Sequence, residues 1–176
     1  MKRMIVLETE RLLLRPFKKS EAALVVSNSR QPSVAIAMSD MVLADEKAGL
    51  DWIRMIRRSA DLKRPCQILA VELKEEKKCV GIIGVIPQSK IQGEMEILFS
   101  IADPYQNRGF ATEACEKIIE WFFSLGKHTY LCAIVKTDNT SSQRVIEKCG
   151  FDFVETREIM YDGEPTMFKY YRLYSS

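Results

Sequence analysis

The feature that most constrains the fold is an amphipathic helix predicted to open at about residue 109. Its apolar residues recur at every fourth position in two adjacent rows, which are Phe110, Ala114, Ile118 and Phe122 beside Ala111, Cys115, Ile119 and Phe123. A stripe this wide covers a flat surface, and a β-sheet is the flat surface that a domain offers. The rest of the chain must therefore provide a sheet on which this helix packs.

Seven segments have the composition of β-strands, at residues 4–15, 68–73, 80–86, 94–102, 130–135, 151–160 and 166–174. Three further helices are predicted at residues 20–28, 45–59 and 140–149. The order along the chain is one strand, two helices, three strands, a helix, a strand, a helix and two strands. This order predicts an α/β (α+β) protein in which a mixed sheet of about seven strands is flanked by about four helices.

Length and composition indicate one soluble domain. The 176 residues are 47% hydrophobic and 28% charged, and no Gly- or Ser-rich linker or repeat divides them. We therefore expect a single domain over residues 1–176. No segment approaches the ~18 consecutive apolar residues of a membrane span, and charges interrupt the apolar run at the N-terminus too early for a signal peptide. A cytoplasmic protein without a membrane partner is expected.

Charge and the rarer residue types exclude several kinds of site. The net charge of +2 is too small for a protein that holds nucleic acid mainly by neutralising phosphates. The single histidine, His128, cannot build a zinc site of two or three imidazoles, and a His-dependent catalytic triad would have to use it. The five cysteines include no C-x-x-C pair and are expected to be reduced thiols. We expect no metal and no nucleic-acid partner.

The junction between the strand at 94–102 and the long helix is a candidate anion site. The unpaired amides at the positive end of a helix dipole suit a phosphate or a pyrophosphate. Gly109 would let the backbone approach a ligand closely, and Arg108 could add a charge-assisted contact. A plain turn at a helix start is the alternative for this segment taken alone.

Separate motifs along the chain resemble one family. Residues 106–111, Gln-Asn-Arg-Gly-Phe-Ala, fit the pattern Q/R-x-x-G-x-G/A, and residues 139–151 have the sequence NTSSQRVIEKCGF. Together they resemble the GNAT superfamily of acyl-CoA N-acyltransferases. The sequences LETERLLLRP at 7–16 and GFATEA at 109–114 are similar to the ribosomal-protein N-terminal acetyltransferase branch of that superfamily. The resemblance covers nearly the whole chain, with its motifs in the expected order.

The resemblance implies an N-acetyltransferase that binds acetyl-CoA as its acyl donor. The CoA pyrophosphate would be cradled by the backbone amides of Arg108, Gly109, Ala111 and Thr112. The strand at 94–102 would carry a bulge and splay from the strand at 130–135 around the acyl-CoA, so that its edge pairs with the pantetheine arm. Asn139 would contact the cofactor arm, with a helix cap as the alternative. The implied cofactor-binding residues are Phe99, Ser100, Ile101, Gln106, Asn107, Arg108, Gly109, Phe110, Ala111, Thr112, Asn139 and Ser142.

This sequence departs from the family pattern at two positions. Many members carry a tyrosine on the last short helix that can protonate the leaving thiolate, and here that position is Ile146. Ser142 matches the serine of the family's N-x-x-S motif and is the candidate acid, with a serine on the helix surface as the alternative. Asn107 stands where glycine is common in the pyrophosphate loop, but asparagine tolerates a positive φ better than most residues.

The implied chemistry needs no protein nucleophile. A neutral amine attacks the thioester directly, while the enzyme positions the amine, removes its proton and polarises the carbonyl through a backbone amide near residues 99–101. Glu96 is the candidate base; the alternatives are a carboxylate that points outward from the strand, and a water chain. An α-amino group with a pKa of ~8 costs about 1.4 kcal/mol to neutralise at pH 7, against about 4.6 kcal/mol for a lysine-like amine.

The acceptor is the part of the reaction that the sequence determines least. The resemblance implies that segments 31–43 and 161–166 shape its pocket. Acidic residues in or near these segments could attract a cationic amine, and they are Asp40, Asp45, Asp162 and Glu164. We expect a protein N-terminal α-amine, with a small amine (a polyamine, an amino acid or an antibiotic) as the alternative. A non-enzymatic CoA-binding module is the third hypothesis, and either a monomer or a homodimer is expected.

Overall fold

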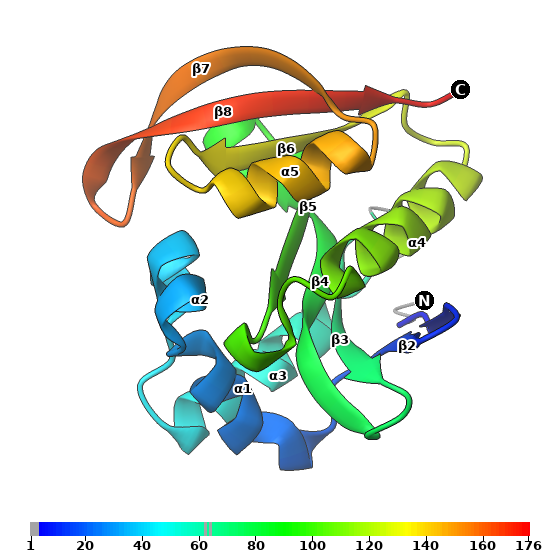
Figure 1. Ribbon diagram of the computed structural model, residues 1–176, viewed down its shortest axis with the longest axis vertical. Helices are drawn as coiled ribbons and strands as arrows, with labels where there is room; N and C mark the ends of the chain where they lie inside the picture. The colour runs from blue at the N-terminus through cyan, green and yellow to red at the C-terminus, as the bar shows by residue number, and fades with distance from the viewer. Residues whose placement is uncertain (1–3, 62, 64) are drawn as a thin grey trace.

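The strands form a mixed β-sheet in the order β1-β2-β3-β4-β5-β6-β8-β7. The computed structural model describes residues 4–61, 63 and 65–176 (Figure 1). The strands are β1 (Leu7–Glu8), β2 (Leu12–Arg15), β3 (Gln67–Leu73), β4 (Lys78–Gln88), β5 (Glu94–Ile101), β6 (Tyr130–Lys136), β7 (Asp152–Tyr161) and β8 (Glu164–Tyr174). The helices are α1 (Ala22–Ser29), α2 (Pro32–Ala37), α3 (Glu46–Ser59), α4 (Phe110–Ser124) and α5 (Thr140–Lys148), with 3-10 turns η1 (Lys19–Glu21), η2 (Ser39–Met41), η3 (Ser89–Ile91) and η4 (Asp103–Tyr105). The predicted α/β fold is confirmed. In the part of the chain that the structure describes, no helix is long and apolar enough to cross a membrane.

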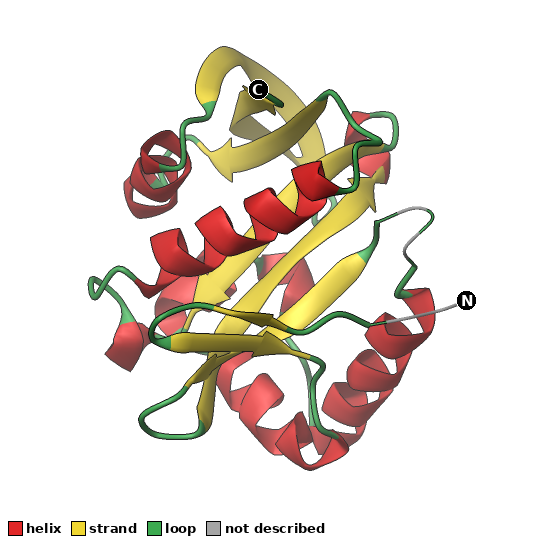
Figure 2. Cartoon of the chain, turned by 90° about the vertical axis from the view of Figure 1, so that its right-hand side faces the viewer, coloured by secondary structure: helices red, strands yellow, loops and turns green. Residues whose placement is uncertain are grey.

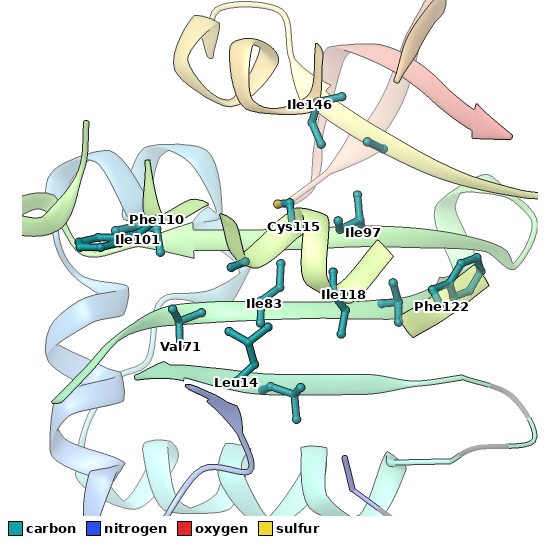
Figure 3. Packing of buried hydrophobic residues seen from close by; sticks show 14 of the residues in the cluster. Leu14, Val71, Ile83, Ile97, Ile101, Phe110, Cys115, Ile118, Phe122 and Ile146 are labelled. Carbon is teal, nitrogen blue, oxygen red and sulfur yellow. The ribbon is translucent and has the colours of Figure 1, made fainter. Parts of the chain in front are cut away.

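Helix α4 packs flat on one face of the sheet (Figure 2). The side chains of its apolar stripe are almost inaccessible to solvent, and they are Phe110, Ala114, Cys115, Ile118 and Phe122. They lie in one core cluster with sheet residues that include Leu14, Ile83 and Ile97 (Figure 3). The packing surface predicted from the helical periodicity is therefore confirmed.

Helices α1 and α3 cover the opposite face of the same sheet. Phe17 and Ile53 belong to a core cluster that includes Ala70 of β3, whereas Leu69 and Val71 of the same strand belong to the cluster under α4. Because successive side chains of a strand point to opposite faces, the sheet is the middle layer between two helical layers. Residues on β5 and β6 can consequently be assigned to a face by their position in the strand.

Two parts of the fold differ from the prediction. The strand expected at 4–15 is two short antiparallel strands, because the chain turns at Thr9, whose Oγ1 accepts a hydrogen bond from the backbone N–H of Leu12 (2.9 Å). The additional helix α2 begins at Pro32, whose fixed φ suits the first helical position and whose missing N–H is not needed there. Within the described residues the fold therefore has eight strands and five α-helices, where about seven and about four were expected.

Strands β5 and β6 are parallel neighbours that diverge. Among the described residues they share one paired position, Glu96 with Cys132, whereas β6 pairs with β8 from Tyr130 to Lys136. The predicted splay is thus confirmed. The predicted bulge in β5 is wrong, because its pairing with β4 runs without a register shift. The divergence arises instead because β6 follows β8 and β7 across the upper part of the molecule, away from β5 (Figure 1).

Candidate active site

A cleft lies in the sheet at the point where β5 and β6 diverge. Both strands line it, β5 with residues 96–99 and β6 with residues 133–136. On the α4 side of the sheet its walls include Asn139, Ser142 and Ile146. On the other side its walls include Asp40, Gln88, Lys90 and Tyr161. Because the cleft has walls on both faces, two ligands can meet at these strands from opposite sides.

Glu96 lies inside this cleft and is only 6% exposed. One carboxylate oxygen, Oε2, accepts a hydrogen bond from Nε2 of Gln88 (2.7 Å). Burial raises the pKa of Glu96 to about 7, although hydrogen bonds from Gln88 and from the backbone of Ile134 act in the opposite direction. The alternative of an outward-pointing carboxylate is therefore wrong. A buried carboxyl that titrates near neutral pH can act as a general base.

The loop before α4 contains two residues with a left-handed backbone. Gly109 has a φ of +81° and is the N-cap residue of α4, so the first amides of the helix follow it directly. Asn107 also lies in the left-handed region, with a φ of +59°, which agrees with the tolerance expected of asparagine. Gln106 is anchored by its side chain, since Nε2 donates to the carbonyl of Ile101 (2.8 Å) and to Oγ of Ser33 (2.7 Å). The loop is thus tied to the end of β5 and to α2.

Arg11, which was not predicted as a site residue, braces the same loop from the β1–β2 turn. Its Nη1 donates to the carbonyl of Arg108 (2.9 Å), and its Nη2 lies 2.7 Å from Oε2 of Glu113. Burial acts to raise the pKa of Glu113, but hydrogen bonds from Thr9 and Arg11 outweigh it, and the pKa lies below its usual value. The guanidinium groups of Arg11 and Arg108 lie 4.5 and 4.9 Å from the ring centroid of Phe110. Two cations therefore lie beside the first turn of α4.

The edge of β5 toward β6 offers backbone groups to a ligand. Residues 99–101 pair with β4 on one side, and the described residues show no pairing with β6 beyond Glu96. Phe99 lines the cleft, whereas Ile101 is buried in the core under α4. Ser100 lines a neighbouring apolar cavity between α1 and the sheet. The side chains of these three residues thus lie in different surroundings, but their backbones lie on the same edge of β5 toward β6.

Helix α5 contributes the polar residues on the α4 side of the cleft. The Oδ1 atom of Asn139 accepts a hydrogen bond from the backbone N–H of Ser142 (3.2 Å), so Asn139 is the N-cap of α5. The helix-cap alternative is confirmed, and a contact between Asn139 and a cofactor stays a prediction. Ser142 is half-buried in the cleft wall, and Ile146 is fully buried beside it. Ser142 therefore brings a hydroxyl to the cleft where Ile146 brings none.

Both segments predicted to shape the acceptor pocket reach the cleft. The first segment lines it with Ala37, Met38, Asp40 and Met41, and the hydroxyl of Tyr161 donates a hydrogen bond to Asp40 across the two segments. Asp45 instead caps α3 by accepting from the backbone N–H of Ala48 (2.8 Å). Asp162 and Glu164 are exposed and do not line the cleft. Of the four acidic residues that were expected at this pocket, Asp40 is the one that lines the cleft.

The chain matches one protein family over most of its length. Residues 11–152 match the family described as acetyltransferase (GNAT) domain. Among curated proteins, the uncharacterized N-acetyltransferase YoaA of Bacillus subtilis (strain 168) is 25% identical over 178 residues, which covers 91% of each chain.

Solved structures share the fold. A GNAT family acetyltransferase from Bacillus anthracis has a TM-score of 0.81 at 23% identity, covering 97% of this chain and 98% of that one. The microcin C7 self immunity acetyltransferase MccE, in complex with acetyl-CoA and AMP, has a TM-score of 0.78 at 15% identity and coverages of 95% and 94%. The ribosomal-protein-S5-alanine acetyltransferase from Vibrio fischeri has a TM-score of 0.76 at 16% identity and coverages of 97% and 96%. These structures are too distant in sequence to carry a substrate to this chain.

Proposed function

Because the chain belongs to the GNAT acetyltransferase family and is an acetyl-CoA-dependent N-acetyltransferase, we propose that its acceptor is a primary α-amino group. The N-terminus of a protein is the first candidate. One observation carries the proposal: Glu96 is buried in the cleft between β5 and β6 and has a pKa of about 7. Such a base matches an α-amine of pKa ~8 far better than a lysine side chain of pKa ~10.4.

The cofactor is proposed to lie on the α4 side of the sheet. The loop before α4 fits a pyrophosphate, because Gly109 exposes backbone amides at the positive end of the helix and Arg108 lies beside them. The edge of residues 99–101 toward β6, which has no strand partner among the described residues, fits the amide groups of a pantetheine arm. The thioester would then lie near Phe99, within the cleft that Glu96 and Ser142 also line.

The reaction that we propose moves one acetyl group and one proton. Glu96 accepts a proton from the acceptor amine, whose nitrogen attacks the thioester carbonyl. The carbon–sulfur bond then breaks, and Ser142 supplies a proton to the departing sulfur and regains one from solvent. A thiol of pKa ~8.5 is an undemanding leaving group, so Ser142 contributes less than Glu96.

A small amine is the second candidate acceptor, and one contact favours it. The hydrogen bond between Tyr161 and Asp40 joins the segment before α3 to the end of β7 beside the cleft. A cleft bordered in this way favours a compact acceptor. The first candidate is favoured by the sequences at 7–16 and 109–114, which are similar to the ribosomal-protein branch.

Thiol release from acetyl-CoA in the presence of single amines tests the proposal. The panel contains short peptides with free N-termini, the same peptides blocked at the N-terminus but carrying a lysine, and small amines. We expect turnover with free α-amines and little with lysine side chains. Turnover that requires a lysine side chain would contradict the α-amine proposal.

Gln88 is expected to set the pH at which Glu96 works. In the native protein the hydrogen bond from Gln88 lowers the pKa of Glu96, whereas burial raises it. The Gln88→Met variant removes this hydrogen bond, so the pKa of Glu96 rises further. The rising limb of kcat/KM against pH should move upward by about one pH unit. The control is the same change in a Glu96→Gln background, where the limb near pH 7 is absent and Gln88→Met should leave the remaining profile unchanged. An unchanged limb in the single variant would remove Gln88 from this role.

Ser142→Ala is expected to lower kcat by about three- to tenfold, because a leaving thiolate needs only modest help. The matched control is Ser141→Ala, since Ser141 is the exposed neighbour on the same helix. Stopped-flow measurement of thiol release under saturating acetyl-CoA gives both rates. Equal rates for the two variants would show that Ser142 is not the acid.

A further inference from the structure

We propose that the acceptor carries an anionic group a few bonds from its amine, and that Lys136 binds this group. The inference rests on the proposed function, because it concerns the acceptor of the same reaction. It is carried by four side chains that line the cleft on the face opposite α4, namely Asp40, Lys90, Lys136 and Tyr161.

Asp40, the acid expected to attract a cationic amine, already has partners. Its carboxylate accepts a hydrogen bond from the hydroxyl of Tyr161, and its Oδ2 lies 3.4 Å from Nζ of Lys90. A cationic acceptor would have to compete with Lys90 for this carboxylate. Glu96 is the other acid that lines the cleft, and it faces the reacting amine. The cleft is therefore poorly suited to a second positive charge on the acceptor.

Lys136 is the cation in the cleft whose charge is not balanced. In the described part of the chain its Nζ has no carboxylate partner; it donates to the carbonyl of Ile36 (2.7 Å) and lies 4.7 Å from the ring centroid of Tyr161. The Nζ of Lys90 lies 4.2 Å from the same centroid. An ammonium group has three N–H donors, so Lys136 keeps two of them for a ligand. Two ammonium groups therefore lie over the ring of Tyr161, and Lys90 is the one of them that is paired with a carboxylate.

The strand geometry places Lys136 and Glu96 on the same face of the sheet. Lys136 is four residues beyond Cys132, which pairs with Glu96, and alternation puts the side chains of Cys132 and Lys136 on the same face of β6. The side chains of Lys136 and Glu96 line one cleft. A small acceptor can therefore contact Glu96 through its amine and Lys136 through an anionic group.

A carboxylate beside an α-amine has two common sources. One is a free amino acid, whose own carboxylate is adjacent to the amine. The other is a peptide whose first or second residue is acidic. Both present the same chemistry to Lys136, and both satisfy the α-amine preference proposed from Glu96.

Acceptor pairs that differ only in this charge test the inference. The first arm compares L-amino acids with their α-amides, and the second compares peptides that have Glu at the second position with peptides that have Gln there. In at least one arm the native enzyme is expected to have a kcat/KM about tenfold or more higher for the charged member. Lys136→Met should reduce this preference to near unity, and Lys136→Arg should retain it. Lys47→Met, which removes an exposed lysine on α3, is the matched control.

Calorimetry with acetyl-CoA separates the possible failures. Lys136→Met should bind acetyl-CoA as the native enzyme does, because Lys136 lies on the acceptor face. Equal kcat/KM for both members of every pair, or a Lys136→Met loss shared equally by charged and neutral acceptors, would overturn the inference and leave the proposed function intact. Binding of acetyl-CoA without acetylation of any α-amine would overturn the proposed function, and the inference with it.

Discussion

Glu96→Gln is expected to lower kcat by a factor of about 10²–10⁴, the usual contribution of a positioned general base. The side chain keeps its size and can keep a hydrogen bond to Gln88, but an amide cannot accept the proton of the amine. The limb of kcat/KM that rises through about pH 7 should disappear, because burial raises the pKa of Glu96 to about 7 and the variant has no group there to titrate. The limb near pH 8 that belongs to an α-amine acceptor should remain.

The loss of activity should be accompanied by a gain in stability, which excludes unfolding as its cause. The pKa of Glu96 is higher in the folded than in the unfolded state, so the free energy of unfolding falls as the pH rises from about 4.5 to about 7. Above pH 7 the full penalty remains. This penalty is about 3 kcal/mol. Denaturant unfolding at pH 8 should therefore show Glu96→Gln to be more stable by about 1–3 kcal/mol, with no gain at pH 4.

The control for this prediction is Glu116→Gln, since Glu116 is exposed on α4 and does not line the cleft. It should change neither kcat nor the pH profile. A Glu96→Gln variant with a native kcat and a native profile would assign the base to a water chain or to another group.

Gly109→Glu is expected to weaken acetyl-CoA binding by a factor of about 100 or more, which is about 2.7 kcal/mol. The φ of +81° disfavours any side chain, and an added Cβ would lie 3.2 Å from Nη2 of Arg11. A carboxylate at this point would also face the proposed pyrophosphate and could draw Arg11 away from Glu113. Isothermal titration calorimetry measures the change in affinity directly.

Gly126→Glu is the matched control, because Gly126 follows α4 at its other end. Its φ of +61° is also positive, and a Cβ there would meet no atom within 4 Å. The two variants therefore share the residue change and a strained backbone, but only one lies at the proposed phosphate site. Equal affinities of both variants for acetyl-CoA would show that the loop before α4 does not hold the cofactor.

The parts of the protein that could be predicted from sequence are those in which the decisive residues are close together in the chain. The apolar rows of α4 follow a period of four residues, so its packing face was predictable before any partner was known. The loop before it is equally local, since the left-handed backbone at Asn107 and Gly109 depends on those residues themselves. The divergence of β5 and β6 followed from the family resemblance, but its origin in the path of β6 along β8 did not.

The parts that could not be predicted bring together residues from distant segments. Arg11 reaches Glu113 and the carbonyl of Arg108 from the other end of the chain. Tyr161 meets Asp40 only because β7 crosses near η2. No spacing in the sequence marks either contact, because each depends on how the elements pack. The missed helix α2 differs: it is six residues long, too short for a periodic pattern.

By itself, the sequence determined the α/β class, the helix that covers the sheet, the glycine at the start of that helix and the family to which these motifs belong. Glu96 was a candidate base in the sequence, with an exposed carboxylate as an equal alternative. Only the tertiary structure showed that this carboxyl is buried and has a raised pKa, because both depend on the solvent that its neighbours exclude. The proposed site for an anionic group of the acceptor likewise depends on the tertiary structure, since its side chains meet only when the sheet and its connections are folded, and they are Asp40, Lys90, Lys136 and Tyr161.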